Sequence, residues 1–92
     1  MKMYIELSHD EIQKEIPYQI IAETTSRSIW DTGRRKRLFA SLFTEAERDM
    51  VSKIKAQAHS WALVKGVPDK GVKMTIGTYQ LWHKFADFCA TL

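Results

Sequence analysis

The stretch TEAERDMVSKIKAQAHSWALVKG, residues 44–66, decides the fold that we predict for this chain. Thr44 and Glu47 match the capping box, in which each side chain accepts a hydrogen bond from the other residue's backbone amide. At about 100° per residue, one face of this segment collects apolar side chains: Met50, Val51, Ile54, Ala58 and Trp61. The pattern predicts a long amphipathic helix from Thr44 to about Lys65, which Gly66 ends in a left-handed conformation.

The C-terminal segment has the same kind of pattern. Thr75 is the predicted cap of a helix over residues 76–90. Its apolar face contains Leu81, Trp82, Phe85, Phe88, Cys89 and Leu92. Because only the turn VPDKG (67–71) separates the two apolar faces, we expect the two helices to pack as an antiparallel pair.

A third helix is predicted over residues 33–43, capped by Asp31 or Thr32. Four side chains form its expected apolar side: Leu38, Phe39, Leu42 and Phe43. This helix would complete the core of the predicted helical pair.

The N-terminal third has weaker patterns. Ser8 and Glu11 form another capping box, which begins a helix near residue 9 that Pro17 ends or kinks. Residues 1–7 are either a short strand or an extended lead-in, and residues 18–30 are either helical or extended. We therefore predict an all-α fold, a single domain over residues 1–92. It is a small bundle of three to four helices, with a short N-terminal strand as an open alternative.

The composition is typical of a folded globular chain. Of the 92 residues, 45% are apolar and 27% are charged, which argues against disorder. One cysteine excludes an internal disulfide framework. The N-terminus lacks the apolar stretch of a signal peptide, and no apolar run approaches the ~20 residues of a membrane span. We expect a cytoplasmic location and no membrane partner.

Charge is distributed unevenly along the chain. The net charge is −3 over residues 1–32, +5 over residues 33–66 and +1 over residues 67–92. The acidic N-terminal segment either attracts the basic middle within the fold or faces a different partner.

Most of the basic character lies in GRRKRLF, residues 33–39. Four consecutive cations on a helix point around most of its circumference, and in a first turn they oppose the helix dipole. On the long helix, Arg48, Lys55 and His59 share one exposed side. The predicted partner-binding residues are Arg34, Arg35, Lys36, Arg37, Arg48 and Lys55. The alternative is a solvated face that the acidic segment partly neutralises.

Sequence-specific DNA binding by a helix-turn-helix is not expected. A recognition helix presents its first residues to DNA, and here Glu45, Glu47 and Asp49 would repel phosphate.

Catalysis is not expected either. HExxH, CxxC, GxSxG and a glycine-rich phosphate loop are all missing from the sequence, so we predict no enzyme, metal or cofactor. Cys89 lies on a core face, where a thiol is a poor nucleophile. His59 and His83 would meet across the helical pair, but two ligands do not make a zinc site.

Several apolar side chains lie off the predicted core faces: Trp30, Leu63, Ile76 and Tyr79. They either close the ends of the core or form an apolar contact surrounded by cations, as in protein-binding surfaces.

Four pieces of sequence carry a resemblance: RRKRLF (34–39), LFTEAER (42–48), LVKGVP (63–68) and FCATL (88–92). Through them, the last two thirds of the chain resembles small bacteriophage and prophage proteins of gut Firmicutes. The resemblance transfers no site residues. It implies a phage accessory protein in the bacterial host cell, a class that includes inhibitors of host defence nucleases and small regulators that act by binding.

Together these patterns favour a non-enzymatic binding or regulatory protein that engages a macromolecular partner, such as a host nucleic-acid-handling or defence protein. A protein partner is the first expectation. The alternatives are sequence-nonspecific binding of DNA or RNA through the same cations, and a structural homo-oligomer in which leftover apolar surface pairs with its copy.

Overall fold

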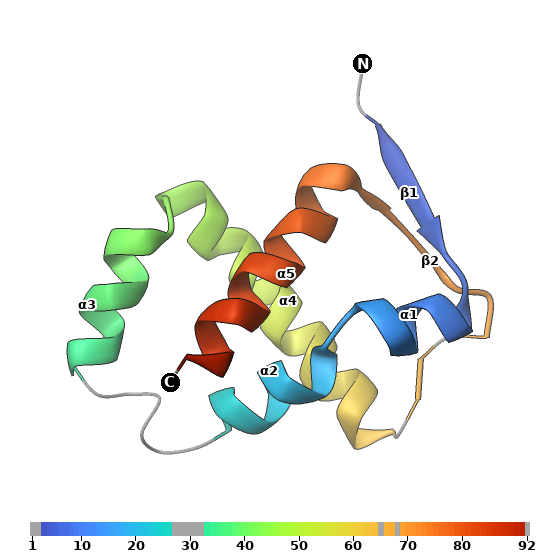
Figure 1. The fold of residues 1–92 in the computed structure, drawn as a ribbon, viewed down its shortest axis with the longest axis horizontal. Coiled ribbons are helices and arrows are strands. Elements are labelled where there is room, and N and C mark those ends of the chain that lie inside the picture. Colours follow the sequence, from blue (N-terminus) through green and yellow to red (C-terminus); the bar gives the residue numbers. More distant parts are fainter. Residues whose placement is uncertain (1–2, 27–32, 65, 68, 92) are drawn as a thin grey trace.

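The computed structural model describes residues 3–26, 33–64, 66–67 and 69–91, and these form two strands and five helices (Figure 1). In chain order they are β1 (Tyr4–Leu7), α1 (His9–Glu15), α2 (Tyr18–Thr25), α3 (Gly33–Leu42), α4 (Glu45–Leu63), β2 (Val72–Thr75) and α5 (Ile76–Ala90). The mostly helical fold is confirmed. The predicted count of three to four helices is wrong, because Pro17 divides the N-terminal helical region into two separate helices.

Local capping signals were reliable. In the Ser8 capping box, the Glu11 amide donates to Ser8 Oγ and the Ser8 amide donates to Glu11 Oε1, each at 3.2 Å. Thr44 and Thr75 cap α4 and α5 as predicted. The ambiguous segment after Pro17 is helical through Thr25. Residues 27–32 lie outside the described residues, and so do Trp30 and the predicted caps Asp31 and Thr32.

The strands form a small antiparallel sheet in which Tyr4 pairs with Thr75 and Leu7 pairs with Val72. The N-terminal strand is therefore confirmed, whereas its partner β2 was not predicted. Gly71, directly before β2, has a φ of 77° and lies against the Leu7 carbonyl group so closely that a Cβ would clash.

The left-handed glycine was predicted at the wrong position. Gly66 does not have a positive φ, and α4 ends at Leu63 with Val64 as a right-handed C-cap. The Gly66 amide donates to the Trp61 carbonyl oxygen at 3.0 Å and so satisfies one group at the helix end.

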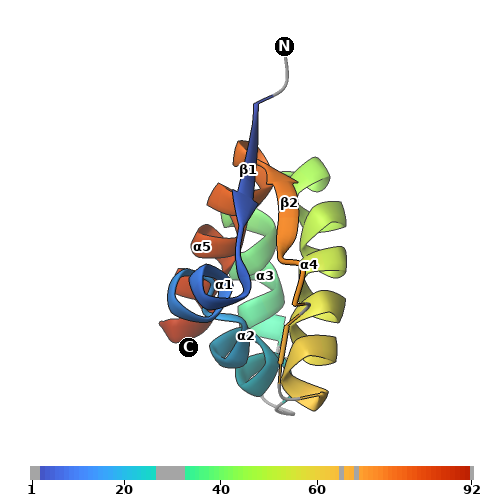
Figure 2. The same cartoon turned by 90° about the vertical axis from the view of Figure 1, so that its right-hand side faces the viewer.

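The expected antiparallel pairing of the two long helices is also wrong. After α4, β2 carries the chain back along the molecule, so α4 and α5 begin at the same end and cross (Figures 1 and 2). The predicted turn is present at Asp69 and Lys70, directly before Gly71 and β2. The described members of the predicted apolar faces are buried, apart from half-buried Met50, and Leu92 lies outside the described residues. Trp61 of α4 stacks on Trp82 of α5 with ring centroids 5.4 Å apart.

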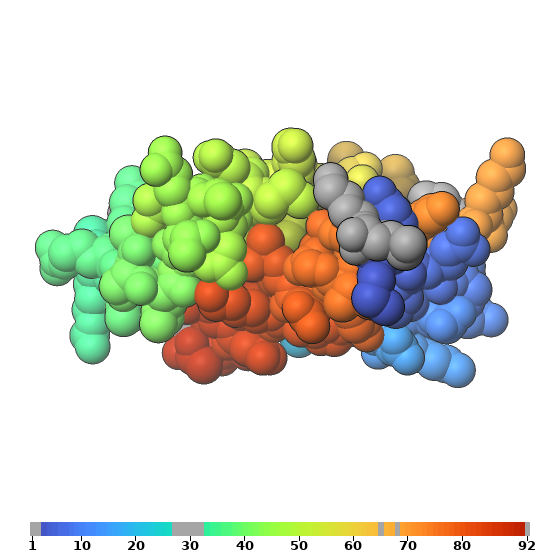
Figure 3. Space-filling model, turned by 90° about the horizontal axis from the view of Figure 1, so that it is seen from above, coloured from blue at the N-terminus to red at the C-terminus, as the bar shows by residue number. Residues whose placement is uncertain are grey.

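Helix α3 packs differently from the other long helices, because it contains no fully buried residue. Half-buried Phe39 and buried Phe43, just beyond the helix, attach it to Phe85 and Phe88 of α5. Two members of its predicted apolar side face solvent instead: Leu38 and Leu42 are 42% and 53% exposed. Figure 3 shows α3 at one end of a molecule that measures 39 × 34 × 18 Å, with β1 and α1 at the other.

Candidate functional site

A groove of about 260 Å³ separates α3 from α4. Its lining consists of Arg35, Lys36 and Phe39 from α3, with Arg48, Val51, Ser52 and Lys55 from α4. Four of the six predicted partner-binding residues therefore meet at this groove, although sequence alone did not show that they share a cavity. Phe39 and Val51 add an apolar floor between the cationic walls.

The basic run divides into two pairs because it is helical from its first residue. Arg35 and Lys36 are on the groove side, where Phe39 lies one turn further along. Arg34 and Arg37 are exposed and do not line the groove. The expectation that the run cannot form one flat patch agrees with this arrangement.

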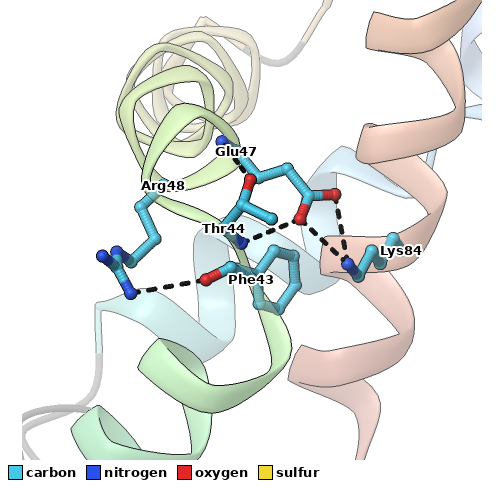
Figure 4. A network of polar contacts seen from close by, with 5 residues as sticks. All are labelled: Phe43, Thr44, Glu47, Arg48 and Lys84. Atoms are coloured by element: carbon cyan, nitrogen blue, oxygen red, sulfur yellow. Dashed lines mark hydrogen bonds and ion pairs between the residues drawn. The ribbon is translucent and has the colours of Figure 1, made fainter.

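Arg48 also has a structural role that sequence reasoning missed. Its Nη1 donates to the carbonyl oxygen of Ala40 at 3.1 Å. It also donates to the carbonyl oxygen of Phe43 at 3.3 Å (Figure 4). These carbonyls lie at the C-terminal end of α3, where a cation also interacts favourably with the helix dipole. Arg48 thus holds α3 against α4 while it lines the groove.

Glu47 faces the other side of α4 from Arg48 (Figure 4). One carboxylate oxygen accepts from the Thr44 amide at 2.9 Å, and Lys84 Nζ of α5 donates to both oxygens at 3.1 and 3.2 Å. The Thr44 backbone hydrogen bond, followed by Lys84, lowers the pKa of Glu47 below its usual value. Lys84 Nζ also lies 4.6 Å from the centre of the Phe43 ring. The carboxylate of Glu47 is thereby directed toward α5 and away from the groove.

The described elements of the acidic N-terminal segment, β1, α1 and α2, contribute no residue to the groove lining. Four of its acidic side chains belong to β1 and α1: Glu6, Asp10, Glu11 and Glu15. Both elements lie at the opposite end of the molecule from α3 (Figures 1 and 3). Neutralisation of the groove by these four residues is therefore excluded.

His59 was expected beside Arg48 and Lys55 but does not line the groove. Its Nε2 lies 2.7 Å from Oγ1 of Thr25, which donates its hydrogen to the Ile21 carbonyl oxygen, also at 2.7 Å. Because the Thr25 hydroxyl has one hydrogen, Nε2 of His59 must carry the proton in the other contact. His59 therefore joins α4 to α2.

The other candidate reactive groups are dispersed. His9 Nδ1 donates to the Val67 carbonyl oxygen at 3.2 Å, and the His83 ring contacts Tyr79. Burial raises the pKa of Cys89 to about 12, so its thiol is protonated near neutral pH. In the described ranges, no three His, Cys, Asp or Glu side chains gather as metal ligands do.

Two of the predicted off-face apolar residues, Leu63 and Tyr79, do not line the groove with the cations, and Trp30 lies outside the described residues. Tyr79 is half-buried, and its hydroxyl donates to Glu15 at 3.1 Å. Leu63 and Val64 are 84% and 68% exposed, at the end of α4 beyond the groove, and Ile20 of α2 is 43% exposed. The apolar component of the groove is instead Phe39 with Val51, which the sequence assigned only to the core.

No protein-family model, curated protein or solved structure matches this chain. Among the described residues, each helix is too short or too polar to cross a lipid bilayer.

Proposed function

We propose that this chain is a non-enzymatic binding protein that engages a macromolecular partner through the groove between α3 and α4 and the cations around it. The observation that carries the proposal is the meeting of Arg35, Lys36 and Lys55 around the apolar floor of Phe39 and Val51. Arginine and aromatic side chains are enriched at protein interfaces, where an apolar centre is surrounded by polar groups.

The resemblance of the last two thirds of the chain to phage and prophage proteins guides the proposed setting. We assign the protein to the cytoplasm of a bacterial host, as a phage accessory protein that modulates a nucleic-acid-handling or defence protein. Positive charge on one partner and negative charge on the other accelerate their encounter and favour one docking orientation. A protein partner with an acidic surface fits this arrangement.

A second candidate function is sequence-nonspecific binding of DNA or RNA. Arg34 and Arg37 are exposed outside the groove, so positive charge surrounds much of α3 rather than one wall alone. Phosphate contacts of this kind give an affinity that falls log-linearly with salt concentration. An interface with an apolar centre depends less steeply on salt.

A pull-down from bacterial lysate tests both candidates, with and without nuclease treatment. Three double variants carry the same charge change: Lys36→Glu with Lys55→Glu, Arg34→Glu with Arg37→Glu, and the control Lys14→Glu with Lys70→Glu. Lys14 and Lys70 are exposed and belong to neither the basic run nor the groove. Because the three variants change the charge equally, their overall attraction to polyanions stays comparable. Any difference in the proteins they recover therefore depends on where the charges lie.

We expect specific proteins to be recovered despite nuclease, lost with the groove variant and retained with the control. Loss of all partners on nuclease treatment would favour nucleic acid. Identical recovery with all three variants would contradict the proposal, because charge around α3 would then have no part in binding.

Self-association remains the third hypothesis. The exposed side chains of Ile20, Leu63 and Val64 are one part of the apolar surface that a second copy would cover. Sedimentation velocity over a hundredfold concentration range tests it, and a constant monomeric mass would eliminate it.

A further inference from the structure

We infer that the groove between α3 and α4 accepts a short acidic peptide segment of a protein partner, with one aromatic or aliphatic side chain inserted between the helices. This inference rests on the proposed function and specifies its ligand. The groove combines two requirements, since cations line its walls and apolar atoms form its floor. A ligand with carboxylates and an apolar side chain satisfies both.

The volume of the groove limits what enters it. At about 260 Å³, it lies below the roughly 300–1,000 Å³ of pockets that enclose a whole small-molecule ligand. A single large side chain is a better match. The partner backbone then runs along the mouth of the groove, where its neighbouring carboxylates reach the cationic walls.

The length of the cationic wall sets the length of the segment. Arg48, Ser52 and Lys55 lie on one face of α4, and seven residues of helix span about 10.5 Å. An extended peptide advances about 3.3 Å per residue, so about three residues cover this distance. A seven-residue peptide therefore fills the groove with residues to spare at both ends.

The cations of the groove have different roles. Arg48 donates to two carbonyl oxygens of the α3 end, and this anchors the groove wall. Arg35 and Lys36 line one wall and Lys55 lines the other, so an incoming carboxylate meets positive charge on both sides.

The floor favours a peptide over a nucleic acid. Bases bind single-strand proteins by stacking on accessible aromatic faces. Phe39, the aromatic residue of the groove, is half-buried and packs against three other rings, with centroid distances of 4.9 Å to Phe43, 5.9 Å to Phe88 and 6.0 Å to Phe85. An inserted side chain needs only the remaining edge of this ring, together with Val51.

Fluorescence anisotropy with labelled seven-residue peptides tests the inference. The main probes are Glu-Glu-Asp-X-Asp-Glu-Glu peptides in which X is Phe, Trp, Leu or Ile. The matched probes have X as Gly, or keep Phe and replace every acidic residue by Ser. An oligothymidylate of the same net charge represents the phosphate alternative.

The protein variants are Ser52→Phe, which fills the groove without changing charge, and the control Ser60→Phe. Both serines are exposed on α4, but only Ser52 lines the groove. Circular dichroism establishes that both variants remain folded.

We expect at least one peptide with an apolar X to bind at least tenfold more tightly than the Gly peptide, as burial of a large side chain predicts. Ser52→Phe should weaken that binding at least tenfold, and Ser60→Phe should change it less than twofold. The Ser-flanked peptide should not bind.

Three results would overturn the inference: equal binding of the Gly peptide, no loss with Ser52→Phe, or tighter binding of oligothymidylate. Failure of every peptide would overturn it too. If lysate proteins were still lost with the Lys36→Glu and Lys55→Glu variant in that case, the proposed function would stand and only its assignment to an acidic segment would fall.

Discussion

Arg48 Nη1, at the end of the first turn of α4, donates a hydrogen bond to the Ala40 carbonyl oxygen, 3.1 Å away in the last turn of α3. A charged donor at a helix C-terminus stabilises carbonyls that have no partner within the helix. We expect Arg48→Met, which keeps most of the aliphatic length, to lower the free energy of unfolding by about 1 kcal/mol. Amide exchange in α3 should accelerate more than in α5, as measured by hydrogen–deuterium exchange.

The control for Arg48 is Lys53→Met, which removes a cation from an exposed position of the same helix outside the α3–α4 groove. This change should leave exchange in α3 as in the parent chain. Equal exchange in the Arg48 variant and this control would show that Arg48 does not hold α3.

Phe39 and Leu38 are neighbours with different energetic roles. Phe39 is half-buried among the rings of Phe43, Phe85 and Phe88, whereas Leu38 is 42% exposed. Phe39→Ala should cost about 2–3 kcal/mol, less than a fully buried phenylalanine, and Leu38→Ala about 0.5 kcal/mol or less. Urea denaturation followed by circular dichroism measures both. Similar values for the two variants would mean that Leu38 also contributes to attachment of α3.

Gly71 and Gly77 form a second matched pair. At Gly71 the φ of 77° disfavours any side chain, and an added Cβ would meet the Leu7 carbonyl oxygen. Gly71→Ala should therefore lower stability by about 1–2 kcal/mol or more. Gly77 lies in α5 with no atom near the position of an added Cβ, so Gly77→Ala should raise stability by about 0.5–1 kcal/mol. Thermal denaturation with opposite shifts in Tm would confirm both, whereas an unchanged or raised Tm for Gly71→Ala would contradict the close approach of Gly71 to Leu7.

Because the thiol of Cys89 is buried, we expect the protein to lose stability in alkaline solution. Burial raises the pKa of the folded thiol to about 12, whereas an unfolded thiol titrates near ~8.5. Above a pH of ~8.5 the Cys89 thiol of the unfolded chain releases a proton that the folded chain keeps. Higher pH therefore stabilises the unfolded state relative to the folded state. The contribution of Cys89 to folding is fully present below that pH and declines by up to about 1.4 kcal/mol per pH unit above it.

Urea unfolding between pH 7 and 10 measures the effect of Cys89, with Cys89→Ala as the comparison. The substitution lowers the free energy of unfolding at every pH because packing is lost. It also removes the contribution of the cysteine to the slope of that free energy against pH. Other titrating groups affect both proteins alike. Parallel curves above pH 8.5 would show that the folded thiol titrates normally.

The features that sequence predicted well are local. A capping box depends on two residues three positions apart, so Ser8 and Thr44 marked helix starts correctly. The apolar faces of α4 and α5 follow from the helical repeat, and their described members are buried, apart from half-buried Met50. The N-terminal strand was predicted only as an alternative, because four residues are too few to establish a periodicity.

The features that sequence missed depend on distant residues. Pairing of β1 with β2 joins opposite ends of the chain, and the return along β2 sets the direction of α5. Phe39 and Leu38 were equivalent in the helical pattern, yet α3 makes so shallow a contact that only one of them reaches the core. The difference in burial between Phe39 and Leu38 therefore depends on how α3 packs against the rest of the fold.

For the candidate site, the amino-acid sequence by itself determined how much positive charge is present: seven cations in residues 33–55, on two helices separated by a tight corner. It also determined that a helical run of four cations must point in several directions, since successive residues are about 100° apart. Only the tertiary structure decided which of them face one another. The packing of Phe39 and Phe43 against α5, with Arg48 bound to the α3 carbonyls, turns Arg35 and Lys36 toward Lys55 and leaves Arg34 and Arg37 outside. Which side chains face one another across the groove depends on how the two helices cross, and no local sequence pattern specifies that crossing.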